Sequence, residues 1–308
     1  MKKIFRSPTI LGSALICFGL STAIIGCKTE VKDAPEQSEA SGEVDPAAES
    51  TKLMSIGGGL FSIPSPIQTS LLIERTGAEY DKSVLNSVKN MSGYATNFQK
   101  AINLGVYGAD VGYVTIYDQS QDALKYMTSI RRLSDDLGIS GAFDQATIER
   151  FERNFGVRDS MLNLVSVAYR NTDAFLKNND RLNIGACVLA GGWLETIYFS
   201  TMIADKGKDQ ELINRIGEQK HTLENIIKML QPYAAEEEYG KLLDDLMNLA
   251  YDFDAIDIKY TYVKPITDVD AKTTTINSTS DVVISEEHLK TISDRVAEIR
   301  NGLIGSAS

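Results

Sequence analysis

Apolar residues recur with helical spacing along most of the chain. Ala123, Tyr126, Ile130 and Leu133 follow one another at intervals of three and four residues, and Gly138 stands where such a helix would end. Four more stripes of this kind cover Met161–Phe175, Leu212–Leu230, Tyr239–Ile256 and Leu289–Leu303. Because each stripe gives a helix one apolar face, the pattern predicts an all-α, antiparallel multi-helix bundle. We place the helical domain at residues 53–260.

A different pattern separates this domain from the last helix. The stretch from Tyr260 to Ile284 is rich in Thr, Val, Ile, Asp and Ser, which favours a short strand or hairpin, or an extended arm. Ser285 then has the features of an N-cap, with Glu286 and Glu287 in the first turn of a helix. We therefore expect residues 261–308 to form an extended segment followed by a C-terminal helix.

Two glycine-rich segments have the same spacing at an offset of 80 residues. Gly105 is followed by Gly112, and Gly185 is followed by Gly192, with an Asn two residues before the first Gly in each copy. Small residues allow two helix backbones to approach closely, so we expect these two helices at the centre of the domain. The spacing also predicts a two-fold internal repeat, with coincidence as the alternative. A tetratricopeptide-like helical repeat is a further alternative, although its Trp-Leu-Gly-Tyr-Ala-Phe-Pro pattern is absent.

The second glycine-rich segment is also long and apolar enough to be considered as a transmembrane helix. Residues 184–204 contain one charge, Glu195, near the middle. A carboxylate at the centre of a membrane helix is costly, so a buried core helix is the favoured interpretation.

The N-terminus has the layout of a secretory signal peptide. Lys2, Lys3 and Arg6 precede an apolar stretch, which ends in Ile24-Ile25-Gly26-Cys27. This tetrapeptide resembles the lipobox of bacterial lipoproteins. The resemblance implies that the Cys27 thiol receives a diacylglycerol and that cleavage before it frees an amine for further acylation. We assign residues 1–26 to the signal peptide and residues 27–52 to a flexible, Glu- and Ser-rich tether. A secreted protein with an incidental cysteine is the alternative.

Charge narrows the choice of partners. The whole chain has a net charge of −11, and removal of the three basic residues of the signal leaves 28 basic against 42 acidic residues, or −14. Such acidity excludes nucleic acid as a partner. The expected partners are the membrane, through Cys27, and a protein of the cell envelope. No Asp follows Cys27, which favours the outer membrane of a Gram-negative bacterium.

The candidate chemistry lies in the two glycine-rich helices. Asp110 and Glu195 are carboxylates inside apolar helices, so we expect both to be buried and either paired or raised in pKa. A structural hydrogen bond or ion pair is one interpretation, and a ligand pocket is another. The aromatic residues that would line this pocket are Tyr107, Tyr113, Tyr117, Trp193 and Tyr198.

The rest of the sequence contains no pattern typical of an active site. There are two histidines, His221 and His288, and neither stands in a nucleophile-histidine pattern. The glycines at 57–59 lack the Lys-Ser/Thr of a phosphate loop. We therefore expect no metal and no cofactor, and an enzyme is less favoured than a binding protein.

A resemblance to known proteins points in the same direction. The segments Ile63–Pro66, Arg75–Ala78 and Ala101–Asp110 are similar to uncharacterised helical lipoproteins of the Bacteroidota, over most of residues 60–260. The resemblance implies a location and no activity. The leading functional hypothesis is a non-enzymatic envelope module that binds or scaffolds a partner. The alternatives are a lipoprotein that binds a small or apolar ligand in the tyrosine-rich centre, and a hydrolase or lyase that uses the buried carboxylates.

Overall fold

A computed structural model describes the backbone of residues 52–56, 59–63, 66–142, 149–150, 153–154, 157–178, 181–207, 209–268 and 273–305. The chain divides into two compact units, and all of these residues belong to the second, residues 44–308. The predicted signal peptide, Cys27 and nearly all of the predicted tether lie outside the described residues.

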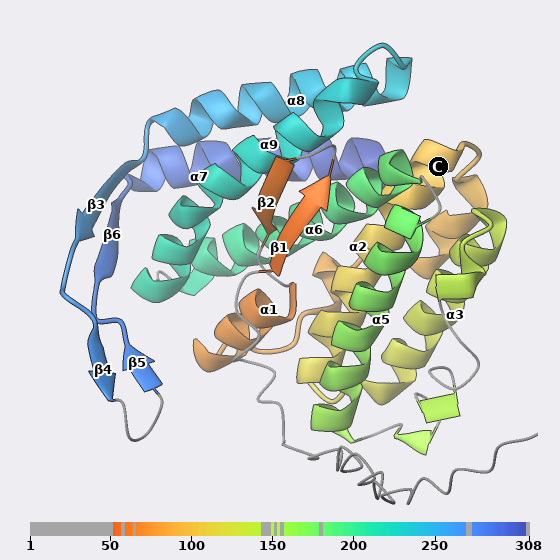
Figure 1. Cartoon of the computed structure of the whole chain (residues 1–308), viewed down its shortest axis with the longest axis horizontal. Coiled ribbons are helices and arrows are strands. Elements are labelled where there is room, and N and C mark those ends of the chain that lie inside the picture. Colours follow the sequence, from red (N-terminus) through yellow and green to blue (C-terminus); the bar gives the residue numbers. More distant parts are fainter. Residues whose placement is uncertain are drawn as a thin grey trace, which may run out of the picture. The chain divides into compact units, whose positions relative to one another are not determined.

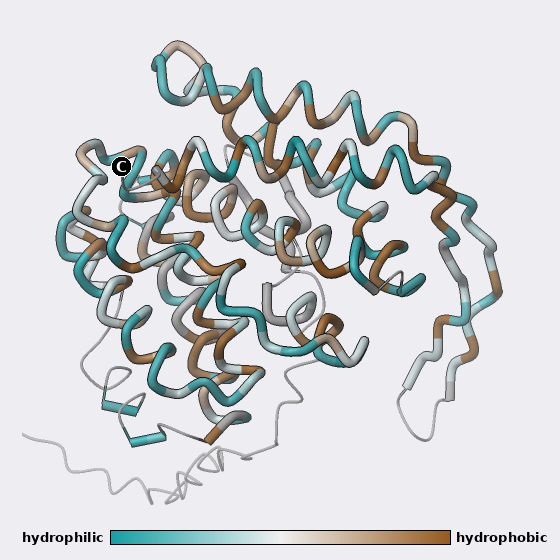
Figure 2. The backbone as a smooth tube through the Cα atoms, turned by 180° about the vertical axis from the view of Figure 1, so that it is seen from behind, coloured by the Kyte–Doolittle hydropathy of each residue, from teal (hydrophilic) through white to brown (hydrophobic). Residues whose placement is uncertain are grey.

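Helices make up most of the described chain, as the all-α prediction requires. They are α1 (Pro66–Arg75), α2 (Asn97–Ile116), α3 (Ser120–Asp136), α5 (Arg158–Asn178), α6 (Leu182–Gly207), α7 (Gln210–Leu230), α8 (Glu237–Asp254) and α9 (Glu286–Ile304) (Figure 1). Short 3-10 turns are η1 (Lys82–Val84), η2 (Val88–Gly93), η3 (Ser140–Ala142) and η4 (Gln231–Tyr233). Brown and teal positions alternate along the outer helices, as expected for helices with one buried face (Figure 2).

The ends of several helices follow the signals in the sequence. Gly138, just after α3, has a φ of 68°, a left-handed conformation that glycine adopts without a Cβ clash. At the start of α9 the Ser285 hydroxyl accepts a hydrogen bond from the His288 amide at 3.1 Å, so the predicted N-cap is confirmed. α2 begins with a capping box between Thr96 and Gln99.

Helices α2 and α6 form the centre of the domain, as the glycine pattern predicted. A Cβ placed on Gly105 would lie 2.0 Å from the Val188 carbonyl oxygen, and one on Gly191 would lie 1.9 Å from the Ile102 carbonyl oxygen. Only glycine permits this approach of the two backbones. The contacts advance in the same direction along both helices, from Ile102 beside Gly191 to Asp110 beside Glu195. The two-fold repeat stays a prediction.

Helix α6 is the one described helix that is long and apolar enough to cross a membrane. Its apolar span covers Leu182–Lys206, and 83% of the most apolar window is buried inside the domain. Burial on all sides, with Glu195 inside, agrees with the predicted core helix.

The strands form three antiparallel pairs. β1 (Lys52–Ile56) pairs with β2 (Gly59–Ile63), at the end of the predicted tether and the start of the predicted helical domain. Apolar residues on both sides of the glycines at 57–59 are typical of a hairpin, and this signal was missed. In the extended segment, β3 (Asp257–Thr261) pairs with β6 (Thr279–Val283), and β4 (Ile266–Asp268) pairs with β5 (Thr273–Thr275). The hairpin predicted there is confirmed (Figure 1).

Candidate functional site

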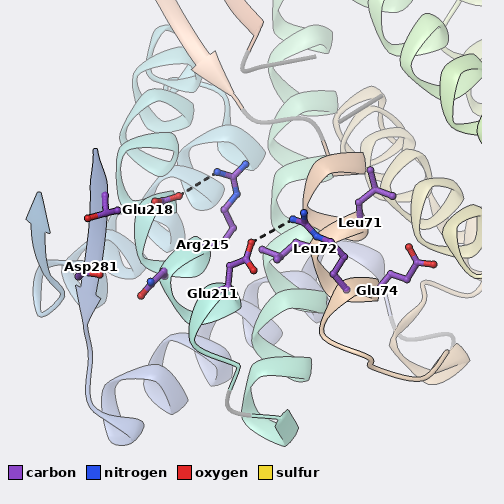
Figure 3. A pocket seen from close by; sticks show the side chains of 10 residues that line it. Leu71, Leu72, Glu74, Glu211, Arg215, Glu218 and Asp281 are labelled. Carbon is purple, nitrogen blue, oxygen red and sulfur yellow. Dashed lines mark hydrogen bonds and ion pairs between the residues drawn. The ribbon is translucent and has the colours of Figure 1, made fainter. Parts of the chain in front are cut away.

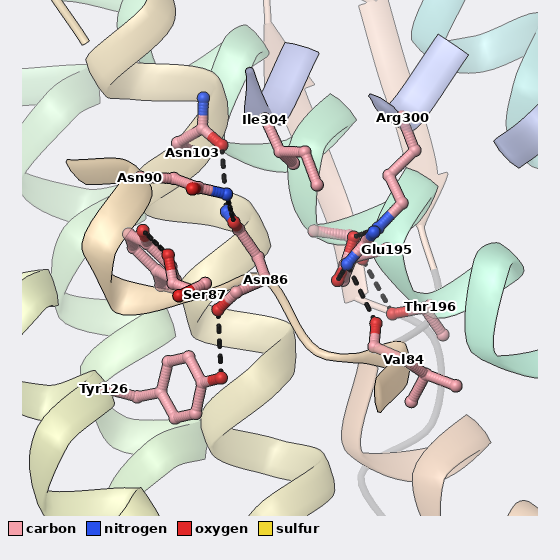
Figure 4. Close-up of polar contacts among 12 residues, drawn as sticks. Val84, Asn86, Ser87, Asn90, Asn103, Tyr126, Glu195, Thr196, Arg300 and Ile304 are labelled. Carbon is pink, nitrogen blue, oxygen red and sulfur yellow. Dashed lines mark hydrogen bonds and ion pairs between the residues drawn. The ribbon is translucent and has the colours of Figure 1, made fainter. Parts of the chain in front are cut away.

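The two predicted buried carboxylates meet at a buried arginine. Asp110 on α2 and Glu195 on α6 have no exposed surface, and Arg300 on α9 is 4% exposed. The Arg300 guanidinium donates to both oxygens of Glu195, at 2.6 and 2.7 Å (Figure 4). It also donates to the Val84 carbonyl at 2.8 Å and lies 4.1 Å from the centre of the Tyr198 ring. This bidentate pair joins α9 to the core helix α6.

Asp110 has a different environment from Glu195. Neither of its carboxyl oxygens makes a well-aligned hydrogen bond within the described part of the chain, although the Asn86 backbone amide and the Glu195 carboxylate lie near enough to act on its pKa. Burial, and then the nearby Glu195 carboxylate, raise the pKa of Asp110 well above its ordinary value, against the opposing effect of Arg300. Burial also raises the pKa of Glu195, against the two hydrogen bonds from Arg300. Because one arginine balances one carboxylate, we infer that Asp110, which Arg300 does not hydrogen-bond, is the carboxyl group that holds a proton. The cluster of three residues is then electrically neutral.

A second buried network ties the end of α9 to the segment before α2. The Tyr94 hydroxyl donates to the Ile304 carbonyl at 3.1 Å, and the Asn103 amide donates to the Leu303 carbonyl at 3.0 Å. Asn86 connects Tyr94 and Asn103, because its side-chain amide donates to the Tyr94 hydroxyl and to the side-chain oxygen of Asn103 (Figure 4). Carbonyls at a helix C-terminus have no partner within the helix, and here side chains distant in sequence satisfy them.

Three of the predicted pocket tyrosines make hydrogen bonds to one backbone segment. The hydroxyls of Tyr107 and Tyr117 donate to the carbonyls of Ser87 and Ala78, at 3.0 and 2.7 Å. The Tyr113 hydroxyl accepts from the Asp81 amide at 3.1 Å. Tyr107 and Tyr113 lie on α2 and Tyr117 follows its last residue, so their polar ends hold residues 78–87 against that helix. Burial raises the pKa of each phenol.

The two remaining aromatic residues of the predicted pocket, Tyr198 and Trp193, lie in different surroundings. Tyr198 lies against Arg300 and so joins the carboxylate cluster. Trp193, 4% exposed, donates from its indole nitrogen to Gln219 of α7 at 3.2 Å. The structure therefore brings Asp110, Glu195 and Tyr198 together. A ligand pocket among the seven residues stays a prediction, and none of them lines either of the two cavities described next.

Sequence reasoning did not identify Arg300 as the partner of Glu195. A signal was present, since Arg300 continues the apolar face of α9 at intervals of four residues from Ile292 and Val296, both fully buried. A single arginine on a buried helix face indicates a buried anion elsewhere in the fold. Which of the many acidic residues supplies that anion depends on the tertiary contacts of α6.

An open cleft lies between α1, α7 and β6. Its volume is 760 Å³, and Figure 3 shows charged side chains from α1, α7 and β6 around it. The lining residues are Leu71, Leu72, Glu74, Arg75, Glu211, Asn214, Arg215, Glu218, Thr279 and Asp281. We call this site the α1–α7 cleft. A second cavity, of 560 Å³, lies between α8, α9 and the start of α2.

The α1–α7 cleft contains one exposed and one half-buried ion pair. Arg75 and Glu211 approach to 3.5 Å with side chains 67% and 70% exposed, and the half-buried Arg215 lies 3.3 Å from Glu218. An exposed pair such as Arg75–Glu211 contributes little to stability, about 0–1 kcal/mol, so it exchanges partners easily. Four acidic and two basic side chains line the cleft, which is therefore net negative. Among the described residues, no group of three or more His, Cys, Asp or Glu side chains is placed to hold a metal ion.

Comparison with known proteins gives no relative. The chain matches no protein-family model, no curated protein and no solved structure. No family, activity or ligand is therefore assigned by similarity.

Proposed function

We propose that this protein is a lipid-anchored, non-enzymatic binding or scaffolding module of the bacterial cell envelope. Acylated Cys27 holds it at the outer membrane of a Gram-negative cell, and the domain engages an envelope protein through the α1–α7 cleft. The lipobox-like Ile24-Ile25-Gly26-Cys27 supports the anchor. The observation that carries the binding role is the open, charged cleft, which contrasts with the closed carboxylate cluster.

The closed cluster argues against an enzyme built on the two carboxylates. A general acid or base must reach the proton of its substrate within hydrogen-bond distance. Glu195 is fully buried and engaged at both oxygens by Arg300. Asp110 is equally buried, on the adjacent helix. The arrangement favours a structural role for this pair.

Charge indicates the kind of partner that the cleft binds. Its net negative lining belongs to a chain of net charge −11, so a basic segment of another protein is attracted over a distance of about 10 Å at moderate salt. Leu71 and Leu72 add apolar contact at the cleft, and the exposed Arg75–Glu211 pair can rearrange around an incoming lysine or arginine. The proposed partner is an envelope protein with an exposed basic segment.

Photo-crosslinking in the native host tests this proposal. A photoreactive amino acid at Asn214, in the cleft, should give a discrete crosslinked product of higher mass. The same amino acid at Asp244, exposed on α8 and outside both described cavities, should not. The double variant Glu211→Gln and Asp281→Asn should weaken the crosslink, whereas Asp244→Asn should leave it unchanged. Equal crosslinking from both positions, or none from Asn214, would contradict the proposal.

The tyrosine-rich centre supports a second candidate function, the binding of a small ligand. The observation that favours it is that neither carboxyl oxygen of the buried Asp110 makes a well-aligned hydrogen bond within the described part of the chain. Native mass spectrometry of the protein purified from its host tests this alternative. A stoichiometric small molecule that is lost in Asp110→Leu would favour the centre as the binding site, and a mass equal to that of the acylated chain would favour the cleft.

A further inference from the structure

The extended segment forms an arm that leaves the helical body. It consists of residues 257–268 and 273–283, which contain β3, β4, β5 and β6 (Figure 1). Only its base packs on the body, where Ile258 faces the buried Val282 and Val282 lies against Gly217 of α7. From Lys259 to Thr267 every residue is exposed. A two-stranded ribbon without a packed face is only marginally stable in water, so further strands paired with the arm would stabilise it.

The arm also holds most of the large apolar side chains that are exposed in the described part of the chain. There are ten such side chains, and six of them belong to the arm. These six are Tyr260, Tyr262, Val263, Ile266, Ile276 and Val283, each at least 40% exposed. The brown positions of the arm lie apart from the helices in Figure 2. Such a concentration is typical of a surface that another molecule covers.

Only one edge of the arm is open for strand pairing along its base. The Val282 amide donates to the Asn214 side chain on α7 at 3.3 Å, so β6 turns its outer edge toward the helical body. In an antiparallel pair, the amide and carbonyl groups of two opposed residues either point toward each other or both point away from the pair. The Val282 amide points away from β3, so the backbone groups of Ile258, which lies opposite Val282, point away from β6. The direction repeats every second residue, so the backbone groups of Tyr260 point away from β6 as well. The outer edge of β3 is therefore a free row of donors and acceptors.

This free edge is complementary to itself. If two β3 strands meet antiparallel about Tyr260, Tyr260 lies opposite Tyr260 of the second copy, and Ile258 lies opposite Tyr262. Lys259 then lies opposite Thr261, and no like charges face each other. Aromatic pairs and aromatic pairs with β-branched residues are the favourable cross-strand contacts. If the two strands met about Ile258 instead, Tyr260 of one copy would lie opposite Ile256 of the other, and Ile256 is buried in the core.

Charge is compatible with a second copy through this arm. The strand from Asp257 to Lys264 contains two lysines and one aspartate, in a chain of net charge −11. In a pair about Tyr260, Lys259 faces Thr261 and Asp257 faces Val263, so no two like charges lie opposite each other across the contact. We propose that the protein forms a two-fold symmetric homodimer in which β3 pairs antiparallel with β3 of a second copy, giving a four-stranded sheet between the two bodies. This dimer uses a different surface from the α1–α7 cleft and does not depend on the lipid anchor.

Disulfide crosslinking of the full-length protein tests the register. Residues that face each other across such a pair have Cα atoms about 5.5 Å apart, which suits a disulfide. Tyr260→Cys should therefore give a disulfide-linked dimer under mild oxidation. Ile276→Cys is the matched control, because Ile276 is 70% exposed but lies between β5 and β6, away from the outer edge of β3. Both variants also carry Cys17→Ser and Cys27→Ser, so Cys187, which is fully buried, is the one natural thiol left and should not interfere.

Sedimentation equilibrium of the full-length protein measures the dimer itself. Tyr260→Glu places two carboxylates opposite each other and should weaken the dimer about tenfold or more, whereas Ile276→Glu should leave its dissociation constant unchanged. Equal crosslinking of the two cysteine variants would overturn the proposal. A wild-type protein that stays monomeric at every concentration measured would overturn it as well. Neither readout involves cleft residues, so failure here is distinguishable from failure of the proposed function.

Discussion

The buried pair between Arg300 and Glu195 makes a sharp prediction about stability. In Arg300→Met the side chain keeps much of its length and loses its charge. Glu195 then loses two hydrogen bonds, of 2.6 and 2.7 Å, and the Val84 carbonyl loses its donor. Three elements, α2, α6 and α9, converge at this point, so the loss affects the attachment of the last helix to the core.

The magnitude follows from the burial of both partners. Removing one member of a buried ion pair typically costs about 3–5 kcal/mol, because the other charge stays buried without compensation. Glu195→Gln should cost less than Arg300→Met. In that variant Asp110 can release its proton and supply the negative charge that balances Arg300, whereas no other cation is buried beside the two carboxyl groups in the described core.

Urea unfolding measures these differences directly. Trp193 is the single tryptophan of the chain and is buried on α6 two residues before Glu195, so its fluorescence reports the core. The slope of the unfolding free energy against urea concentration should stay constant across the variants. Lys290→Met is the control on the same helix, because Lys290 and its partner Asp294 are 66% and 65% exposed, and its unfolding free energy should hardly change.

Two results would refute this reasoning. A cost below about 1 kcal/mol for Arg300→Met would place the pair among exposed ion pairs rather than buried ones. A larger loss of unfolding free energy in Glu195→Gln than in Arg300→Met would mean that Asp110 does not release its proton to balance Arg300. The double variant should be no less stable than Arg300→Met alone, since it leaves no buried charge without a partner.

Other parts of the fold give further predictions. Gly105→Ala should cost about 2–3 kcal/mol in urea unfolding, because its Cβ would meet the Val188 carbonyl, whereas Gly302→Ala, which meets nothing within 4 Å, should stabilise α9 by about 0.5–1 kcal/mol. Asp122, held by two lysines, has its pKa lowered to about 2, so it stabilises the fold above its unfolded pKa of about 4 and loses this effect as the pH falls through 2. Asp122→Asn should therefore cost about 1 kcal/mol at pH 7 and nothing below pH 2, as measured by unfolding across that range. Ser285→Ala removes the cap of α9 and should lower the unfolding free energy by about 1 kcal/mol.

Local signals predicted the helices well because each helix buries a face that the sequence displays. The stripe that includes Ala123, Tyr126, Ile130 and Leu133 became the buried face of α3, and Gly138 ended that helix as predicted. The central position of α2 and α6 was also predictable, since glycine is the residue that allows two helices to approach so closely. These features depend on spacing within one segment or on the size of single residues.

Features that depend on tertiary contacts were not predictable from spacing. The ion pair between Glu195 and Arg300 joins residues 105 positions apart, and nothing local selects Arg300 from the other basic residues. The α1–α7 cleft likewise combines α1 with α7 and β6, which meet only in the folded domain. The β1–β2 hairpin is a different kind of miss, because apolar residues beside the glycines at 57–59 were a usable local signal.

The lipid anchor is the central claim of the proposed function, and metabolic labelling tests it most directly. Cells that express the full chain or Cys27→Ser would be grown with a clickable palmitate analogue and separated into membrane and soluble fractions. The proposed function predicts label on the wild-type protein in the outer-membrane fraction, and no label on Cys27→Ser. An unlabelled wild-type protein that leaves the cell or stays in the soluble fraction would contradict the proposal.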